Sequence, residues 1–140
     1  MKKILPLIFC SFILLGAKRA EKLNLTVAVS GFSSDTGKAY IGLFRKGDKF
    51  PEMSGQFIGK IIPIENKKAE ISFNNLSENT YAIAVFHDKN KNGKLDKNML
   101  GIPTENYGFS NNARETFSAP SFESAAVKLD QSKSISIYIK

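Results

Sequence analysis

The chain has 140 residues, of which 42% are hydrophobic and 24% are charged, with 20 Lys and Arg against 13 Asp and Glu and a formal net charge of +7. This length suits one domain, and the composition excludes a disordered chain, a collagen-like repeat and a coiled coil. The lysines are interspersed with acids and do not form a basic stripe, so we do not expect nucleic-acid binding.

Residues 1–20 have the pattern of a secretory signal peptide, with two lysines near the start, an apolar run over 4–15 and small residues after it. The run is shorter than the about 20 residues of a membrane-spanning helix. We therefore expect cleavage between residues 18 and 21, with an uncleaved anchor as the alternative. Cleavage would remove four basic residues, lowering the formal net charge from +7 to +3, and would also remove Cys10, the only cysteine. The mature chain would then have no disulfide, no stable membrane insertion and a periplasmic, extracellular or cell-surface location.

After residue 20, hydrophobic residues mostly alternate with polar ones, which is the pattern of half-buried β-strands. Six segments are typical of strands: 23–30, 39–44, 57–64, 69–74, 81–86 and 134–139. Segment 81–86 is apolar on both faces and predicts a central strand, whereas Gly59 and Pro63 predict a bend or an edge position for their segment. One short helix is predicted after Ser121, with Phe122, Ala125, Ala126 and Leu129 on one face.

These elements predict an all-β fold, an antiparallel β-sandwich of about seven strands with one short helix, as a single domain over residues 21–140. Residues 88–120 contain no clear strand pattern and are predicted to be a long loop region. Loops of this length in compact domains are usually functional or are ordered by an additional interaction.

The loop region begins with the sequence DKNKNGKLD at 88–96, which predicts a calcium site. Oxygen-bearing side chains at loop positions one, three, five and nine, with Gly93 at six, match how a short loop surrounds a hard cation. The predicted ligands are the side chains of Asp88, Asn90, Asn92 and Asp96 and the backbone carbonyl of Lys94. Met99 stands where an EF-hand has its bidentate Glu, so we expect a loop attached to a strand and an affinity of about 0.1–1 mM.

The alternative for this segment is that Asn92 and Gly93 form a plain type I′ turn and that the Asp and Asn residues are turn formers. We favour the metal because a turn needs two residues, whereas the segment has four oxygen-bearing side chains at the spacing of a cation loop. His87 precedes the loop and is the only histidine. A zinc site needs three or four ligands, so we expect a structural role for His87.

Motifs of the common enzyme classes are absent: the chain has no phosphate-binding glycine loop, no G-x-S-x-G and no H-E-x-x-H. A single His also leaves no partners for a conventional triad. A carboxylate pair such as Glu105 and Glu123 would serve a glycosidase only at a suitable separation. We therefore do not predict an enzyme. The alternative is a small extracytoplasmic hydrolase that uses Asp88, His87 or Glu105.

Three segments and their spacing resemble a bacterial family known as domain of unknown function 2141. They are YAIAVFHDKNKNGKLD at 81–96, GIPTENYGFSN at 101–111 and PSFESA at 120–125, and the sequence GKAYIGLF at 37–44 adds to the likeness. The resemblance covers nearly all of the predicted mature chain. It implies an exported protein with a transthyretin-like or immunoglobulin-like sandwich, and it implies no activity.

Within this resemblance, Glu105, Tyr107 and Phe109 form a candidate binding surface beside the metal loop. Exposed rings would suit a sugar ring or a peptide, whereas the alternative is that both rings are buried at the end of the sandwich. We therefore expect an exported, calcium-stabilised β-sandwich that acts as a binding or structural module. Its partner would be a carbohydrate, a peptide or an envelope protein.

Overall fold

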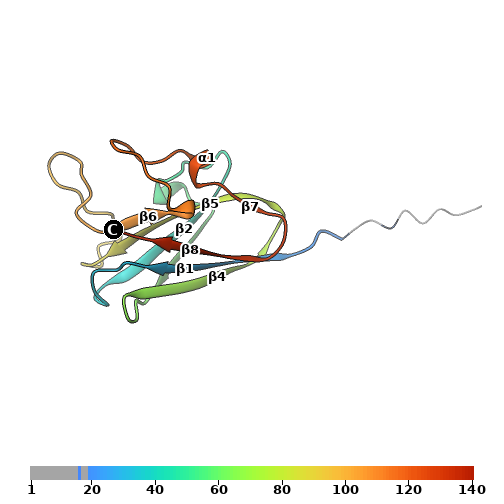
Figure 1. Cartoon of the computed structure of the whole chain (residues 1–140), viewed down its shortest axis with the longest axis horizontal. Coiled ribbons are helices and arrows are strands. Elements are labelled where there is room, and N and C mark those ends of the chain that lie inside the picture. The colour runs from blue at the N-terminus through green and yellow to red at the C-terminus, as the bar shows by residue number, and fades with distance from the viewer. Residues whose placement is uncertain (1–15, 17–18) are drawn as a thin grey trace, which may run out of the picture.

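The computed structural model describes residue 16 and residues 19–140, so most of the predicted signal peptide lies outside the described residues. Residues 19–140 form eight strands in two sheets and one short α-helix (Figure 1), which confirms the predicted all-β fold. The strands are β1 (Leu23–Ser30), β2 (Lys38–Arg45), β3 (Ile58–Ile62), β4 (Lys68–Leu76), β5 (Asn79–Asp88), β6 (Tyr107–Phe109), β7 (Val127–Leu129) and β8 (Lys133–Tyr138). The helix α1 is Phe122–Ala125, and two 3₁₀ turns are η1 (Met53–Gly55) and η2 (Ser110–Asn112).

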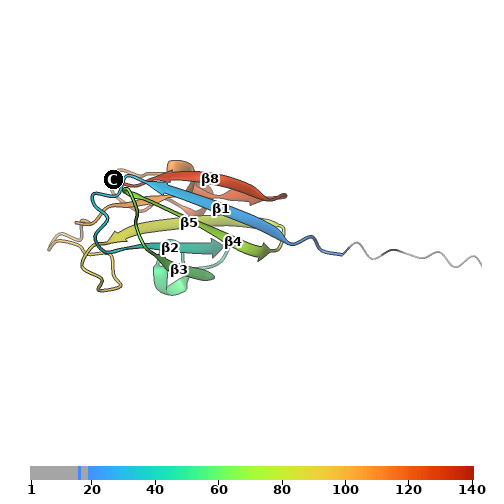
Figure 2. The same ribbon diagram turned by 90° about the horizontal axis from the view of Figure 1, so that it is seen from below.

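One sheet has the order β4-β1-β8 and the other β3-β2-β5-β6, with β7 also paired to β5. Figure 2 shows β8 beside β1 in the first sheet and β3 beside β2 in the second. The predicted edge position of β3 and the predicted central position of β5 are both confirmed. All pairs are antiparallel except β1 with β8, which run parallel from Leu25 opposite Lys133 to Ser30 opposite Tyr138. The sequence predicted an antiparallel sandwich, and this one parallel pair is the exception to it.

Two further predictions need correction, because the loop region contains a strand and the predicted helix is shorter. β6 lies inside residues 88–120, and its three residues are too few to show a period. The helix ends at Ala125 because Ala126 is extended, with φ −64° and ψ 130°. Val127 and Leu129 are buried on one side of β7 and Lys128 is exposed between them, so this end of the predicted helix is a strand.

The main core lies between the sheets, where inward side chains alternate along each strand. It includes Leu25 and Val27 of β1, Ile41 of β2, and Ile83 and Val85 of β5, all buried. The Tyr81 hydroxyl donates to the Ser77 carbonyl at 3.0 Å, which is the tyrosine corner typical of immunoglobulin-like sandwiches. Burial raises the pKa of the Tyr81 hydroxyl above its ordinary value.

A second, smaller core covers the outer face of β2 and β5. Phe44, Ala82 and Ala84 are buried there against Phe109 and Ala125, with Phe50, Met53 and Phe122 packed around them. The Phe50 ring meets the rings of Phe44, Phe109 and Phe122 edge-on, at 5.3, 5.7 and 6.1 Å between centroids. Figure 1 shows α1 on this side of β5. β5 is therefore buried on both faces, which is why its sequence is apolar throughout.

One edge of β5 is shared by two short strands. β7 pairs with residues 79–81 and β6 with residues 84–86. Between them the Ser110 hydroxyl accepts from the Ile83 amide at 2.9 Å and donates to the Ala125 carbonyl at 2.5 Å. The Ser110 side chain thus supplies the hydrogen-bond partner that a continuous strand would have given to Ile83.

Candidate metal site and neighbouring surfaces

The 88–96 loop begins at the end of β5, where the Asp88 side chain accepts two backbone hydrogen bonds. Asp88 Oδ1 accepts from the Asn92 amide at 3.1 Å, and Oδ2 accepts from the Gly93 amide at 2.8 Å. Gly93 has φ +76°, in the left-handed region that disfavours residues with a side chain. The turn predicted for loop position six is therefore present, and it brings the chain back over the buried Asp88 carboxylate.

The other predicted ligands gather around Asp96. Asn90 Nδ2 donates to Asp96 Oδ2 at 2.5 Å and Asn92 Nδ2 donates to Asp96 Oδ1 at 2.7 Å. Asn90 Oδ1 accepts from the Asn92 amide at 3.2 Å, and Asn92 Oδ1 accepts from the Lys94 amide at 2.9 Å. The loop thus brings its polar side chains together through a chain of tight turns, and Lys94 lies in the last of these turns.

Glu105 closes this loop and does not form an exposed surface. Its Oε1 accepts from the Lys89 amide at 2.9 Å and its Oε2 accepts from the Asp96 amide at 3.1 Å, so one carboxylate joins the two ends of the loop. The residue is 7% exposed. The spacing of residues within the loop did not predict this role. Glu105 lies nine residues beyond Asp96, and it reaches the loop only because the chain folds back on itself after residue 96.

The donor set fits a hard cation. All of the predicted ligand atoms are oxygens, which is the preference of calcium, and the site has no sulfur or imidazole ligand for zinc. Each carboxylate and amide oxygen has two lone pairs, so an oxygen that accepts a turn N–H can also bind an ion. Among the described residues no group of three or more His, Cys, Asp or Glu is placed to hold a metal, and two of the four side chains here are Asn.

His87 precedes Asp88 and points to the other face of β5, since successive strand residues alternate. Its ring is fully buried, with Nε2 2.7 Å from the Thr36 carbonyl oxygen and Nδ1 3.5 Å from Ser33 Oγ. The Phe32 ring packs edge-on against it at 5.3 Å. These contacts describe a structural histidine. They give no support to a hydrolase that combines His87 with Asp88 or Glu105.

Tyr107 and Phe109 follow Glu105 and differ in their exposure. Phe109 is 6% exposed and belongs to the second core, while Tyr107 is half-buried with the Arg114 guanidinium 5.2 Å from its ring centroid. Glu105 and Phe109, two of the three residues of the candidate surface, are therefore buried. For Phe109 this is the alternative that the sequence had left open. Tyr107 keeps part of its ring on an open surface.

This open surface is a groove of about 1150 Å³ on the outer face of the β3-β2-β5-β6 sheet, here called the outer groove. The Tyr40 and Phe86 rings, stacked at 4.9 Å, and the rings of Tyr107 and Phe109 are part of its lining. Its walls also include most of residues 93–103 and residues 115–119. The sequence did not predict this groove, because its lining comes from segments far apart in the chain.

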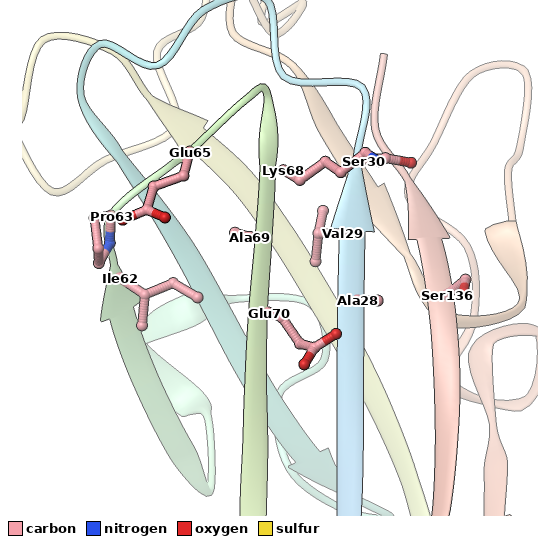
Figure 3. Close-up of a pocket in the computed structure, with 10 residues that line it drawn as sticks. All are labelled: Ala28, Val29, Ser30, Ile62, Pro63, Glu65, Lys68, Ala69, Glu70 and Ser136. Carbon is pink, nitrogen blue, oxygen red and sulfur yellow. The ribbon is translucent and has the colours of Figure 1, made fainter.

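A second depression of about 640 Å³ lies beside β4, where residues 62–65 lead from β3 to β4 (Figure 3). Its charged side chains are Glu65, Lys68 and Glu70, all exposed. In Figure 3 the Glu65 side chain points to one side of β4 and the Lys68 and Glu70 side chains point to the other, so the three do not converge on one ligand.

The model of a family described as "Uncharacterized protein conserved in bacteria (DUF2141)" matches residues 27–137. Searches of curated proteins and of solved structures find no match. Over residues 19–140, no helix combines the length and hydrophobicity needed to cross a bilayer.

Proposed function

Because this chain belongs to the bacterial DUF2141 family, whose description names no activity, we propose from its own residues that it is an exported β-sandwich that acts as a binding or structural module and is stabilised by calcium in the 88–96 loop. The export signal is the basic and apolar pattern of residues 1–20. The partner class is a carbohydrate, a peptide or an envelope protein.

The observation that carries the calcium proposal is the arrangement of side chains around Asp96. Asn90 and Asn92 both contact its carboxylate, and Asp88 is bonded to the turn formed by Asn92 and Gly93. Hydrogen bonds from these two amide groups stabilise the negative charge of Asp96. A calcium ion would take over that role, with the oxygens of Asp88, Asn90, Asn92 and Asp96 and the Lys94 carbonyl as ligands.

The exposed lysines of the loop favour a weak site. Lys89, Lys91, Lys94 and Lys97 surround it, and like charges disfavour a bound cation. We therefore expect a dissociation constant for calcium in the range of extracellular modules, about 0.1–1 mM. A site of this strength would be filled where free calcium is millimolar, so the ion would act as a structural part of the exported protein.

The test is a thermal and denaturant unfolding series of the purified protein in chelator and in calcium. Ten millimolar calcium should raise the free energy of unfolding by about 1.4–2.7 kcal/mol across that affinity range, because the ion binds the native loop only. Magnesium should stabilise less, since it requires a tighter octahedron.

The variant Asp96→Asn should lose the calcium response, because it removes a charged ligand and keeps the side-chain size. Asp130→Asn is the control, since Asp130 is an exposed carboxylate in the turn between β7 and β8. A melting temperature that is unchanged between chelator and calcium would refute the proposal. The loop would then be an Asn-Gly turn held by its own hydrogen bonds.

A further inference from the structure

Residues 96–104 form a hairpin that directly follows the 88–96 loop. The Thr104 amide donates to the Asp96 carbonyl at 2.8 Å, and the Asn98 amide donates to the Ile102 carbonyl at 2.9 Å. At the tip, Asn98 Oδ1 accepts from the Leu100 and Ile102 amides at 2.9 and 3.0 Å. The backbone of the tip is therefore held in a hydrogen-bonded turn.

The hairpin presents apolar side chains to solvent. Met99 is fully exposed, Leu100 is 83% exposed and Ile102 is 55% exposed. Phe117, which also lines the outer groove, is fully exposed as well. Exposed apolar residues that gather at one site mark an interaction surface more often than scattered ones do. Here Leu100, Ile102 and Phe117 line one groove, and Met99 precedes Leu100 in the hairpin.

The exposed charged side chains of residues 88–105 are all positive. Lys89, Lys91, Lys94 and Lys97 are all exposed, and the ion pairs found in the described part of the chain do not include any of them. The acids of this segment, Asp88, Asp96 and Glu105, are buried or half-buried and accept hydrogen bonds within the loop. Glu52 and Glu115 are exposed acids that line the outer groove away from this segment in the sequence. A partner that complements this end of the molecule would combine apolar chemistry with negative charge.

We propose that this end of the molecule docks on an anionic lipid surface, with Met99, Leu100, Ile102 and Phe117 entering the interfacial layer and the lysines facing lipid phosphates. The inference rests on the proposed export of the chain and goes beyond the proposed function, because it adds a lipid surface to the partner classes. Amphipathic surfaces with lysines beside apolar side chains bind anionic bilayers reversibly. The contact is shallow and peripheral, since only the ends of two loops take part.

Two other occupants explain these side chains less well. A small apolar molecule in the outer groove would be held by inward-facing walls, whereas Leu100 and Phe117 are largely exposed. A second copy joined through the 88–104 segments of both chains would bring the lysines of one chain against those of the other, which costs free energy.

The experiment is co-sedimentation of the exported protein with vesicles in chelator. Vesicles of phosphatidylcholine with phosphatidylglycerol should bind the protein, vesicles of phosphatidylcholine alone should bind it roughly ten-fold less, and 1 M salt should weaken binding through screening. The combined variant Met99→Ser, Leu100→Ser and Phe117→Ser should lose roughly ten-fold or more in affinity. Lys94→Gln with Lys97→Gln should do the same on anionic vesicles.

Tyr138→Ser is the matched control, because Tyr138 is an exposed aromatic residue on the other sheet and should leave binding unchanged. No sedimentation with anionic vesicles, or equal binding by the serine variant, would overturn the proposal. A dimer in gel filtration that the serine variant abolishes would also overturn it, in favour of a second copy. Because chelator is present throughout, this result is independent of the calcium response, which is measured without lipid.

Discussion

Replacing Glu105 with Gln should destabilise the protein by about 2 kcal/mol, although the two side chains have nearly the same shape. Glu105 accepts the Lys89 amide on one oxygen and the Asp96 amide on the other. Glutamine has one oxygen, so its NH₂ group would face one of these N–H donors. A hydrogen bond to a charged group contributes about 1.5–3 kcal/mol. Because Glu105 is almost fully buried, water cannot easily replace a hydrogen bond that the substitution removes.

The assay is denaturant unfolding in chelator, which separates this effect from any bound ion. The unfolding midpoint should fall at an unchanged m-value, and the melting temperature should fall by about 5–15 °C. Glu78→Gln is the control, because Glu78 is exposed in the turn between β4 and β5, and it should change stability by less than about 0.5 kcal/mol. If Glu105→Gln is as mild as the control, Glu105 does not hold the loop and the argument from its two hydrogen bonds is wrong.

Two further predictions concern export and pH. Mass spectrometry of the exported protein should show an N-terminus between residues 18 and 21, and an intact Met1 on that protein would contradict the signal-peptide proposal. The side-chain hydrogen bond from Arg45, followed by the Arg45 backbone hydrogen bond, holds the pKa of Asp48 below its ordinary value of 3.8. Asp48 therefore stabilises the fold above the unfolded-state pKa and loses this effect as pH falls through the folded-state pKa. The melting temperatures of the protein and of Asp48→Asn should differ at about pH 6 and converge in acid, and a constant difference would contradict this assignment.

The sequence predicted the long strands because burial on one face gives a period of two, and β1, β4 and β8 have such faces. It predicted the central position of β5 because that strand is buried on both faces. β6 and β7 were missed because a three-residue strand contains too little pattern, and the apolar residues at 122–129 fit a helix as well as a helix followed by a strand. Pairing of residues 127–129 with β5 makes this part a strand, and the sequence of one segment does not show which strand it will pair with.

The candidate site divides in the same way. The turn at Gly93 and the grouping of Asp88, Asn90, Asn92 and Asp96 depend on local spacing, so the sequence could predict them. The role of Glu105 and the outer groove depend on how residues 97–119 return across the sheet. No local rule describes that path. It therefore explains why Glu105 was placed on a candidate surface and is found inside, and why the sequence left both an exposed and a buried position open for Phe109.

The shared edge of β5 has a consequence for how this protein can vary. Both β6 and β7 are anchored on that one strand, and Ser110 joins them through the Ile83 amide and the Ala125 carbonyl. Residues 113–119 leave this anchor and return to it, so their length does not set the register of any strand. Insertions and deletions there would change one wall of the outer groove and leave the sandwich intact, so this wall can diversify independently of the fold.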